Sequence, residues 1–199
     1  GPTAYRFLDF LVRAGQAWWQ MLPIGPTGPD GSPYQAPSAF AGNPLLVSLE
    51  ALAEEGLLDP EDLAVPPGQA FRTDADFAEA ARFKERRLRK AFRRFEEGGD
   101  GRAAALRRFA AANAAWLDDY ALFAALKEAH GGRPWTAWPP PLRDRYPHAL
   151  ANARAAHAGE IRYHAFVQCV FDRQWAALRR YAGKKGIGLI GDLPIFLAH

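Results

Sequence analysis

The chain has 199 residues, of which 49% are hydrophobic and 13% aromatic, with 25 basic and 22 acidic side chains. This composition supplies a core and excludes a disordered linker. The single cysteine, Cys169, excludes an internal disulfide framework and a cysteine-rich metal site, and it favours a reducing compartment. Because no apolar run approaches the roughly 18 residues that cross a bilayer, we expect a soluble, cytoplasmic protein that does not bind membranes.

The first predicted unit is a helix followed by a buried strand. Residues 3–14 form an amphipathic helix, with Thr3 as its N-cap and Gly15 in the left-handed conformation behind it. One face of this helix carries Phe7, Leu8, Leu11 and Val12. The apolar run at 17–24 (AWWQMLPI) has the length of a buried strand and stops at a proline-glycine segment.

Residues 25–44 (GPTGPDGSPYQAPSAFAGNP), here called the rim loop, contain four glycines and five prolines. We expect them to form neither helix nor strand. The pattern does not predict a phosphate-binding loop, because the G-x-x-x-x-G-K-[ST] spacing is absent and the prolines remove backbone N–H donors.

The middle of the chain is predicted to be helical, with helices at about 75–97 and 103–129 separated by Gly98–Gly101. The first helix holds eight basic residues between Arg82 and Arg94. An apolar stripe at i, i+3, i+4 and i+7 predicts an amphipathic helix whose charged face is solvated. A nucleic-acid site is less favoured, because the basic residues are not interleaved with aromatic residues on which the bases of a single strand could stack. This stripe consists of Leu88, Ala91, Phe92 and Phe95.

A second helix-to-strand unit ends the chain, with a helix at 160–182, a basic turn and the apolar run 187–190. Two such units predict an α/β protein with a parallel sheet whose strands are buried on both faces. Residues 50–150 are too many for an ordinary strand connection and predict an inserted helical subdomain. The rim loop and Asp192 should therefore meet at the carboxyl edge of the sheet, where α/β proteins gather their sites.

Three residues at this edge are candidates for binding a ligand. Asp192 directly follows the second strand and could bind sugar hydroxyls or a guanidinium, or it could pair with an unseen Arg or cap the next turn. Tyr34 could stack on a sugar ring or pack its own loop. Ser32 could reach the site or serve as a turn residue before Pro33. We expect no metal, because the histidines lack the spacing of a ligand set and His157 and His164 have no third ligand nearby in the sequence.

Residues 14–58, 116–143 and 162–199 together resemble the 4-alpha-glucanotransferase (amylomaltase) family of the α-amylase clan. The resemblance implies a fragment of a (β/α)8 barrel, about its second and third strands, with residues 1–49 and 151–199 in the barrel and 50–150 as the helical insertion. It also implies transfer of α-1,4-glucan segments between maltooligosaccharides by a retaining double displacement, without a cofactor. The catalytic carboxylates would then lie beyond His199, so that no catalytic residue is in this chain.

The same resemblance implies roles for individual residues. Tyr34 is similar to the tyrosine that stacks on the sugar beside the scissile bond, Ser32 to its neighbour in the site, and Asp192 to the strand-end aspartate of the clan. Asn43 is expected to be structural. Pro29 stands where the family pattern often has a tyrosine of a second glucan-binding groove, so that accessory groove is in doubt.

Two other functions stay open: a non-catalytic glucan-binding module, and a hydrolase or branching enzyme of the same clan. The chain begins without Met and ends at His199, and we expect both ends to lie inside a longer protein. The isolated polypeptide would expose strand edges and is expected to aggregate or stay partly molten.

Overall fold

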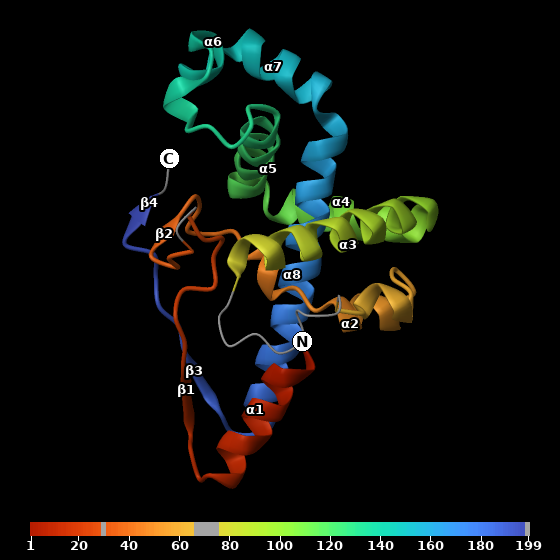
Figure 1. Ribbon diagram of the computed structural model, residues 1–199, viewed down its shortest axis with the longest axis vertical. Helices are drawn as coiled ribbons and strands as arrows, with labels where there is room; N and C mark the ends of the chain where they lie inside the picture. The colour runs from red at the N-terminus through yellow and green to blue at the C-terminus, as the bar shows by residue number, and fades with distance from the viewer. Residues whose placement is uncertain (29–30, 66–75, 198–199) are drawn as a thin grey trace.

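A computed structural model describes residues 1–28, 31–65 and 76–197 (Figure 1). Pro29, whose identity bears on the accessory groove, and the end residue His199 lie outside the described residues. The helices are α1 (Pro2–Arg13), α2 (Leu49–Glu54), α3 (Phe77–Glu97), α4 (Asp100–Ala112), α5 (Ala114–Ala129), α6 (Pro140–Arg143), α7 (Pro147–Ala156) and α8 (Ala158–Lys184). The 3-10 helices are η1 (Pro44–Leu46), η2 (Pro60–Leu63) and η3 (Trp135–Ala137). The strands are β1 (Trp18–Gln20), β2 (Gln35–Ala36), β3 (Gly188–Ile190) and β4 (Phe196–Leu197).

Two short parallel ladders join the ends of the chain. β1 pairs with β3, with Trp19 opposite Leu189, which confirms the predicted parallel arrangement. β2 pairs with β4, with Gln35 opposite Phe196. The expectation that the rim loop contains no strand is therefore wrong. The partner of this strand lies about 160 residues further along the chain, so local composition could not predict the pairing.

The strands are shorter and less buried than predicted. β1 covers three residues of the run 17–24, and only Trp19 in it is partly buried, packed with Leu189 against the cluster between α1 and α8. Trp18 is 63% exposed and Ile190 is 44% exposed. The expectation of burial on both faces is thus wrong within the described residues, because helices cover one face of this two-stranded sheet (Figure 1).

The ends of α1 follow local chain chemistry. Its N-cap is Gly1 and not Thr3, because Pro2 already has a helical backbone and occupies the first turn. Gly15 has φ +68°, which confirms the left-handed residue behind the helix. Leu8 and Leu11 are buried, whereas the flanking positions of the predicted face are more than one third exposed.

The helix predicted over 103–129 is two helices. α4 ends before Asn113 and α5 begins after it. The Asn113 side chain donates to the carbonyl of Phe109 (2.9 Å) and accepts from the indole of Trp116 (3.2 Å), so it competes with the backbone ladder at this point. α3 begins at Phe77, where Asp76 accepts the N–H of Glu79 as the N-cap.

α8 links the helical part of the molecule to the sheet (Figure 1). Its first half contributes Tyr163, Phe166 and Val167 to a core shared with α2, α3, α4 and α5. Its second half contributes Ala182 to the smaller core with α1 and β1. No helix among the described residues is long and apolar enough to span a membrane.

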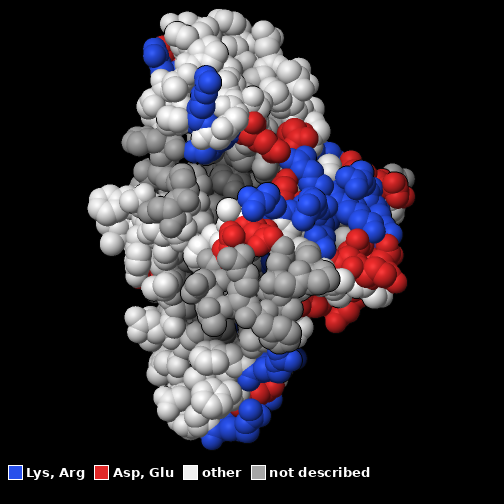
Figure 2. All heavy atoms as spheres, in the orientation of Figure 1, with Lys and Arg blue, Asp and Glu red and all other residues white. Residues whose placement is uncertain are grey.

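The basic face of α3 differs from the predicted solvated face. Lys90 and Arg94 bind Asp59 at 3.0 and 2.5 Å, and Arg89 binds carboxylates on α3, α5 and α8. The Lys84 amine donates to the carbonyl of Leu45, and its burial lowers the pKa of this side chain. In Figure 2 red atoms accordingly border the blue patch of this region. Much of the basic block thus holds the helices together.

Candidate functional site

The site is built where the rim loop meets the segment after β3. The Tyr34 hydroxyl donates to Asp192 Oδ2 at 2.9 Å, and the Phe196 N–H donates to the Tyr34 carbonyl at 3.0 Å. The parallel pairing of β1 with β3 brings both segments to the carboxyl edge of the sheet, and the contact between Phe196 and Tyr34 adjoins the β2–β4 ladder. The predicted proximity of the rim loop and Asp192 is confirmed.

Asp192 uses both oxygens of its carboxylate. Oδ1 accepts the N–H of Leu193 at 2.8 Å, while Oδ2 accepts the Tyr34 hydroxyl. The contact to Leu193 joins adjacent residues, and no turn is assigned at residues 191–194, so capping of a turn by Asp192 is not observed. The hydrogen bond to the carboxylate is the main reason why the pKa of Tyr34 is raised above its usual value. The phenol thus stays protonated and keeps Asp192 as its acceptor.

Ser32 acts on the loop backbone. Its Oγ accepts the N–H of Tyr34 at 3.3 Å, the pattern of a serine turn. Gly31, just before it, has φ +77°, a conformation that glycine adopts without strain. The alternative of a turn residue is thus observed for Ser32, and its turn directly precedes Tyr34.

The base of the rim loop is closed by Asn43. Its N–H donates to the Ile24 carbonyl at 2.9 Å, and its side-chain oxygen accepts the N–H of Leu45 at the same distance, which caps η1. The expected structural role of Asn43 is confirmed. Next to this closure, the buried side chain of Gln168 holds the backbone of Gly42. The sequence reading missed Gln168, although a polar residue within the apolar stretch of a helix was a visible signal.

A cavity of about 260 Å³ adjoins Asp192 and the rim loop. Its walls come from the two loop ends, the α4–α5 junction and α8, and its polar lining includes Asn113, Gln168 and Asp172. At its edge the exposed Phe40 ring stacks on Trp116, with a centroid distance of 6.4 Å. Apolar rings beside a few polar groups are typical of a small-molecule site.

A second cavity, of about 720 Å³, lies between α1, the end of β1 and α8. Its lining is mostly apolar and includes Tyr5, Trp19, Leu22 and Trp175. Neither Tyr34 nor Asp192 lines it, so it is separate from the candidate site although it is larger.

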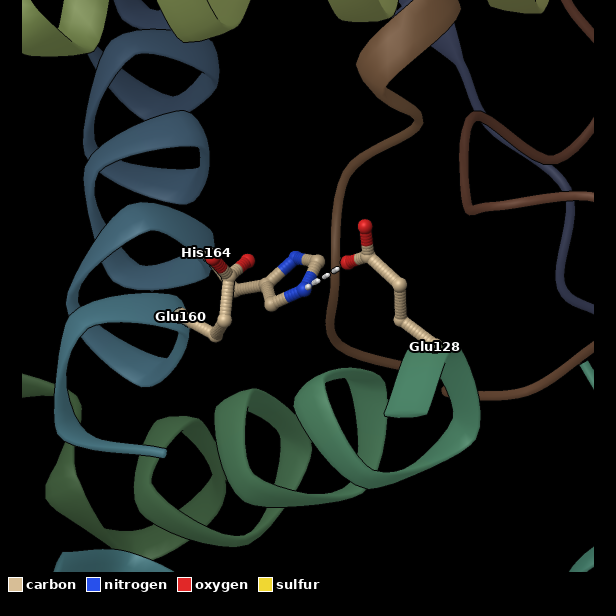
Figure 3. Close-up of side chains that lie close together, drawn as sticks. All are labelled: Glu128, Glu160 and His164. Carbon is tan, nitrogen blue, oxygen red and sulfur yellow. Dashed lines mark ion pairs between the residues drawn. The ribbon is translucent and has the colours of Figure 1, made fainter. Parts of the chain in front are cut away.

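One group of side chains among the described residues has metal-ligating atoms within 4.8 Å of one another: Glu128, Glu160 and His164 (Figure 3). His164 Nε2 lies 3.5 Å from Glu128, and the two come from α8 and α5. However, the Arg89 guanidinium binds Glu160 at 2.6 Å and Glu128 at 2.7 Å, so both carboxylates already have a cationic partner. The sequence reading missed these neighbours of His164, because only Glu160 lies one helical turn away. The chemistry fits an ion-pair network between helices.

Comparison with known proteins identifies the family. The family model described as 4-alpha-glucanotransferase matches residues 1–199. The chain belongs to the 4-alpha-glucanotransferase family. Among curated 4-alpha-glucanotransferases, the relative from Thermus thermophilus is 48% identical over the whole chain, and the one from Synechocystis sp. is 42% identical. The chain spans 39% of the length of each of these relatives.

A solved 4-alpha-glucanotransferase family structure supports the α/β fold. The amylomaltase from Streptococcus agalactiae in complex with acarbose superposes with a TM-score of 0.91 at 35% identity. The match covers 99% of this chain and 40% of that structure. The arrangement of the loop, strands and helical segment is therefore that of an amylomaltase segment, which confirms the family predicted from the sequence.

Proposed function

We propose that this chain forms the donor-side glucan-binding edge of a 4-alpha-glucanotransferase that transfers α-1,4-glucan segments between maltooligosaccharides. The observation that supports this proposal most directly is the 2.9 Å hydrogen bond between Tyr34 and Asp192 at the carboxyl edge of the parallel strands. The family match and the similarity to an amylomaltase solved with acarbose support this function.

In this proposal each site residue has a binding role. The Tyr34 ring stacks on the sugar beside the scissile bond, and Asp192 fixes the ring orientation and accepts sugar hydroxyls. Ser32 sets the turn before Tyr34, so the loop is ordered before the glucan arrives and binding costs less entropy. The nucleophile and the acid/base carboxylate, about 5 Å apart in a retaining enzyme, come from the remainder of the longer protein, and no cofactor takes part.

The proposed architecture is a (β/α)8 barrel in which β1 and β3 are neighbouring strands, about the second and third. Residues 1–49 and 151–199 belong to the barrel and 50–150 form the helical insertion, with α8 packing against both. We propose a cytoplasmic enzyme with no nucleic-acid partner, since the cations Arg89, Lys90 and Arg94 are engaged by acidic partners.

Maltotriose separates this function from the two alternatives. The full-length protein should convert maltotriose into a ladder of longer and shorter glucans with free glucose. Glucose and maltose alone would instead indicate a hydrolase of the same clan. Binding of maltotriose without any product would indicate a non-catalytic glucan-binding module, and either outcome would overturn transfer.

A further inference from the structure

The rim loop is bound to α8 by the side chain of Gln168, whose amide pairs with backbone groups of the loop as a neighbouring strand would. The Gly42 N–H donates to Gln168 Oε1 at 2.7 Å, and Gln168 Nε2 donates to the Gly42 carbonyl at 2.9 Å. The side chain is nearly fully buried, with Gln168 only 2% exposed. Both polar groups of one loop residue are therefore satisfied by one amide, in a place that solvent hardly reaches.

Two more contacts hold the loop near Gly42. A Cβ at Gly42 would lie 2.0 Å from the Phe171 ring, so the backbone lies directly against α8. The next residue, Asn43, donates its N–H to the carbonyl of Ile24, where the loop begins. Gly42 and Asn43 thus join the end of the loop to α8 and to the residue before its start, and Tyr34 lies between these two ends.

The same chemistry is repeated six residues further along α8. Gln174 Oε1 accepts the Ser48 N–H at 2.7 Å, and its Nε2 donates to the Ser48 carbonyl at 3.1 Å. Ser48 lies beyond η1, however, where it accepts the N–H of Ala51 at the start of α2. The second amide therefore holds the connection to α2 and not the loop that carries Tyr34.

We propose that Gln168 is a positioning residue for the glucan site: by holding Gly42 it sets the position of the rim loop and of Tyr34 relative to Asp192. This inference rests on the proposed function in assuming that Tyr34 binds glucan. Gln168 acts through the loop, because its amide is already used on Gly42. Its role requires one acceptor and one donor, which only an amide or a protonated carboxyl of this length provides.

This requirement makes Gln168→Glu informative in the full-length protein. An ionised carboxylate can accept the Gly42 N–H but cannot donate to the Gly42 carbonyl, whereas a protonated one does both. Burial raises the pKa of the introduced carboxyl, so it titrates above the usual range. We expect kcat/KM for maltotriose, relative to the parent at the same pH, to fall about tenfold at high pH and to recover as the pH is lowered. Gln168→Met, which has neither group, should lose a similar factor at every pH.

Gln174→Glu is the matched control, because it changes the same chemistry on the far side of η1. Its thermal unfolding midpoint should also depend on pH, over a lower pH range than in Gln168→Glu because Gln174 is only partly buried, whereas its relative kcat/KM should stay within about twofold of the parent. If Gln168→Glu and Gln168→Met keep the parent kcat/KM, or if Gln174→Glu loses as much activity as they do, Gln168 does not position the site.

Hydrogen exchange separates this inference from the proposed function. At high pH, amides in residues 31–43 should exchange about tenfold faster in Gln168→Glu than in the parent, while those of α1 should not change. If the loop amides respond in this way but the parent does not act on maltotriose, then Gln168 holds the loop as inferred and the proposed function is wrong. If the exchange rates of the loop amides are the same in Gln168→Glu and the parent, Gln168 does not hold the loop, whatever activity the variants show.

Discussion

At Gly42 the rim loop lies directly against α8. We predict that Gly42→Ala destabilises the protein, because its Cβ would lie 2.0 Å from the Phe171 ring and the loop or the helix would have to shift. Overpacking of this kind costs about 1–3 kcal/mol of unfolding free energy. Urea denaturation of the full-length protein would measure this loss.

Gly159 is the matched control for this substitution, because it lies in α8 with no atom within 4 Å of its added Cβ. Gly159→Ala should raise the unfolding free energy by about 0.4–1 kcal/mol through the entropy of the unfolded chain. A Gly42→Ala protein as stable as Gly159→Ala would contradict the close contact with Phe171.

The candidate residues could be predicted to different extents. Asp192 was found because it stands at the end of an apolar run, and Tyr34 because it is an aromatic residue of the loop that follows the other run; parallel pairing alone brings the two segments to one edge. The contact between Gln168 and Gly42 could not be predicted, because no strand pairing brings these two positions together and neither local sequence indicates the other as its partner. The exact partner of a buried glutamine depends on packing that a single sequence does not contain.

The ion pairs of α3 link elements that are distant in sequence. Asp59 lies at the start of η2 and binds Arg94 and Lys90, which lower its folded pKa to about 2 from an ordinary value of 3.8. Since the folded pKa is the lower one, the stabilisation is complete above the unfolded value and is lost as the pH falls from 3.8 to about 2.

We predict that Asp59→Asn flattens the acid dependence of stability in this window. The parent should lose thermal stability as the pH falls from about 5 to 2, and the variant should lose less. Asp144→Asn is a suitable control, because its partner Arg143 is its neighbour in the chain and links no elements. If the thermal stability of the parent and of Asp59→Asn falls in parallel as the pH is lowered, the ion pairs of Asp59 with α3 do not stabilise the fold.

At the level of elements, periodicity predicted the helices better than their ends or partners. The stripe of α3 is correct, and Leu88 and Ala91 are buried in the core. The break at Asn113 was missed, because the residue fits the helical spacing and only its contacts to Phe109 and Trp116 reveal the competition with the backbone. Strand lengths were overestimated because an apolar run does not show how many of its residues find a partner.

The whole chain presents an apolar surface at the sheet and the segment after it. The exposed side chains of this surface include Trp18, Leu22, Ile190, Leu193, Ile195 and Phe196. Exposed strands and apolar patches of this kind favour association. We predict that the isolated 199-residue polypeptide forms aggregates or a partly molten state that binds ANS, measured by light scattering and fluorescence. A monodisperse preparation that unfolds cooperatively would contradict this prediction.

The central claim is that Tyr34 and Asp192 act together on a glucan. The direct measurement is a double-mutant cycle on kcat/KM for maltotriose in the full-length protein, with Tyr34→Phe, Asp192→Asn and both. Each single change should lower kcat/KM about tenfold, and the double variant should be little less active than the less active of the two single variants. The control Tyr146→Phe, at the N-cap of α7, should not change kcat/KM. Full activity in the single variants, or losses that simply multiply in the double variant, would contradict the account.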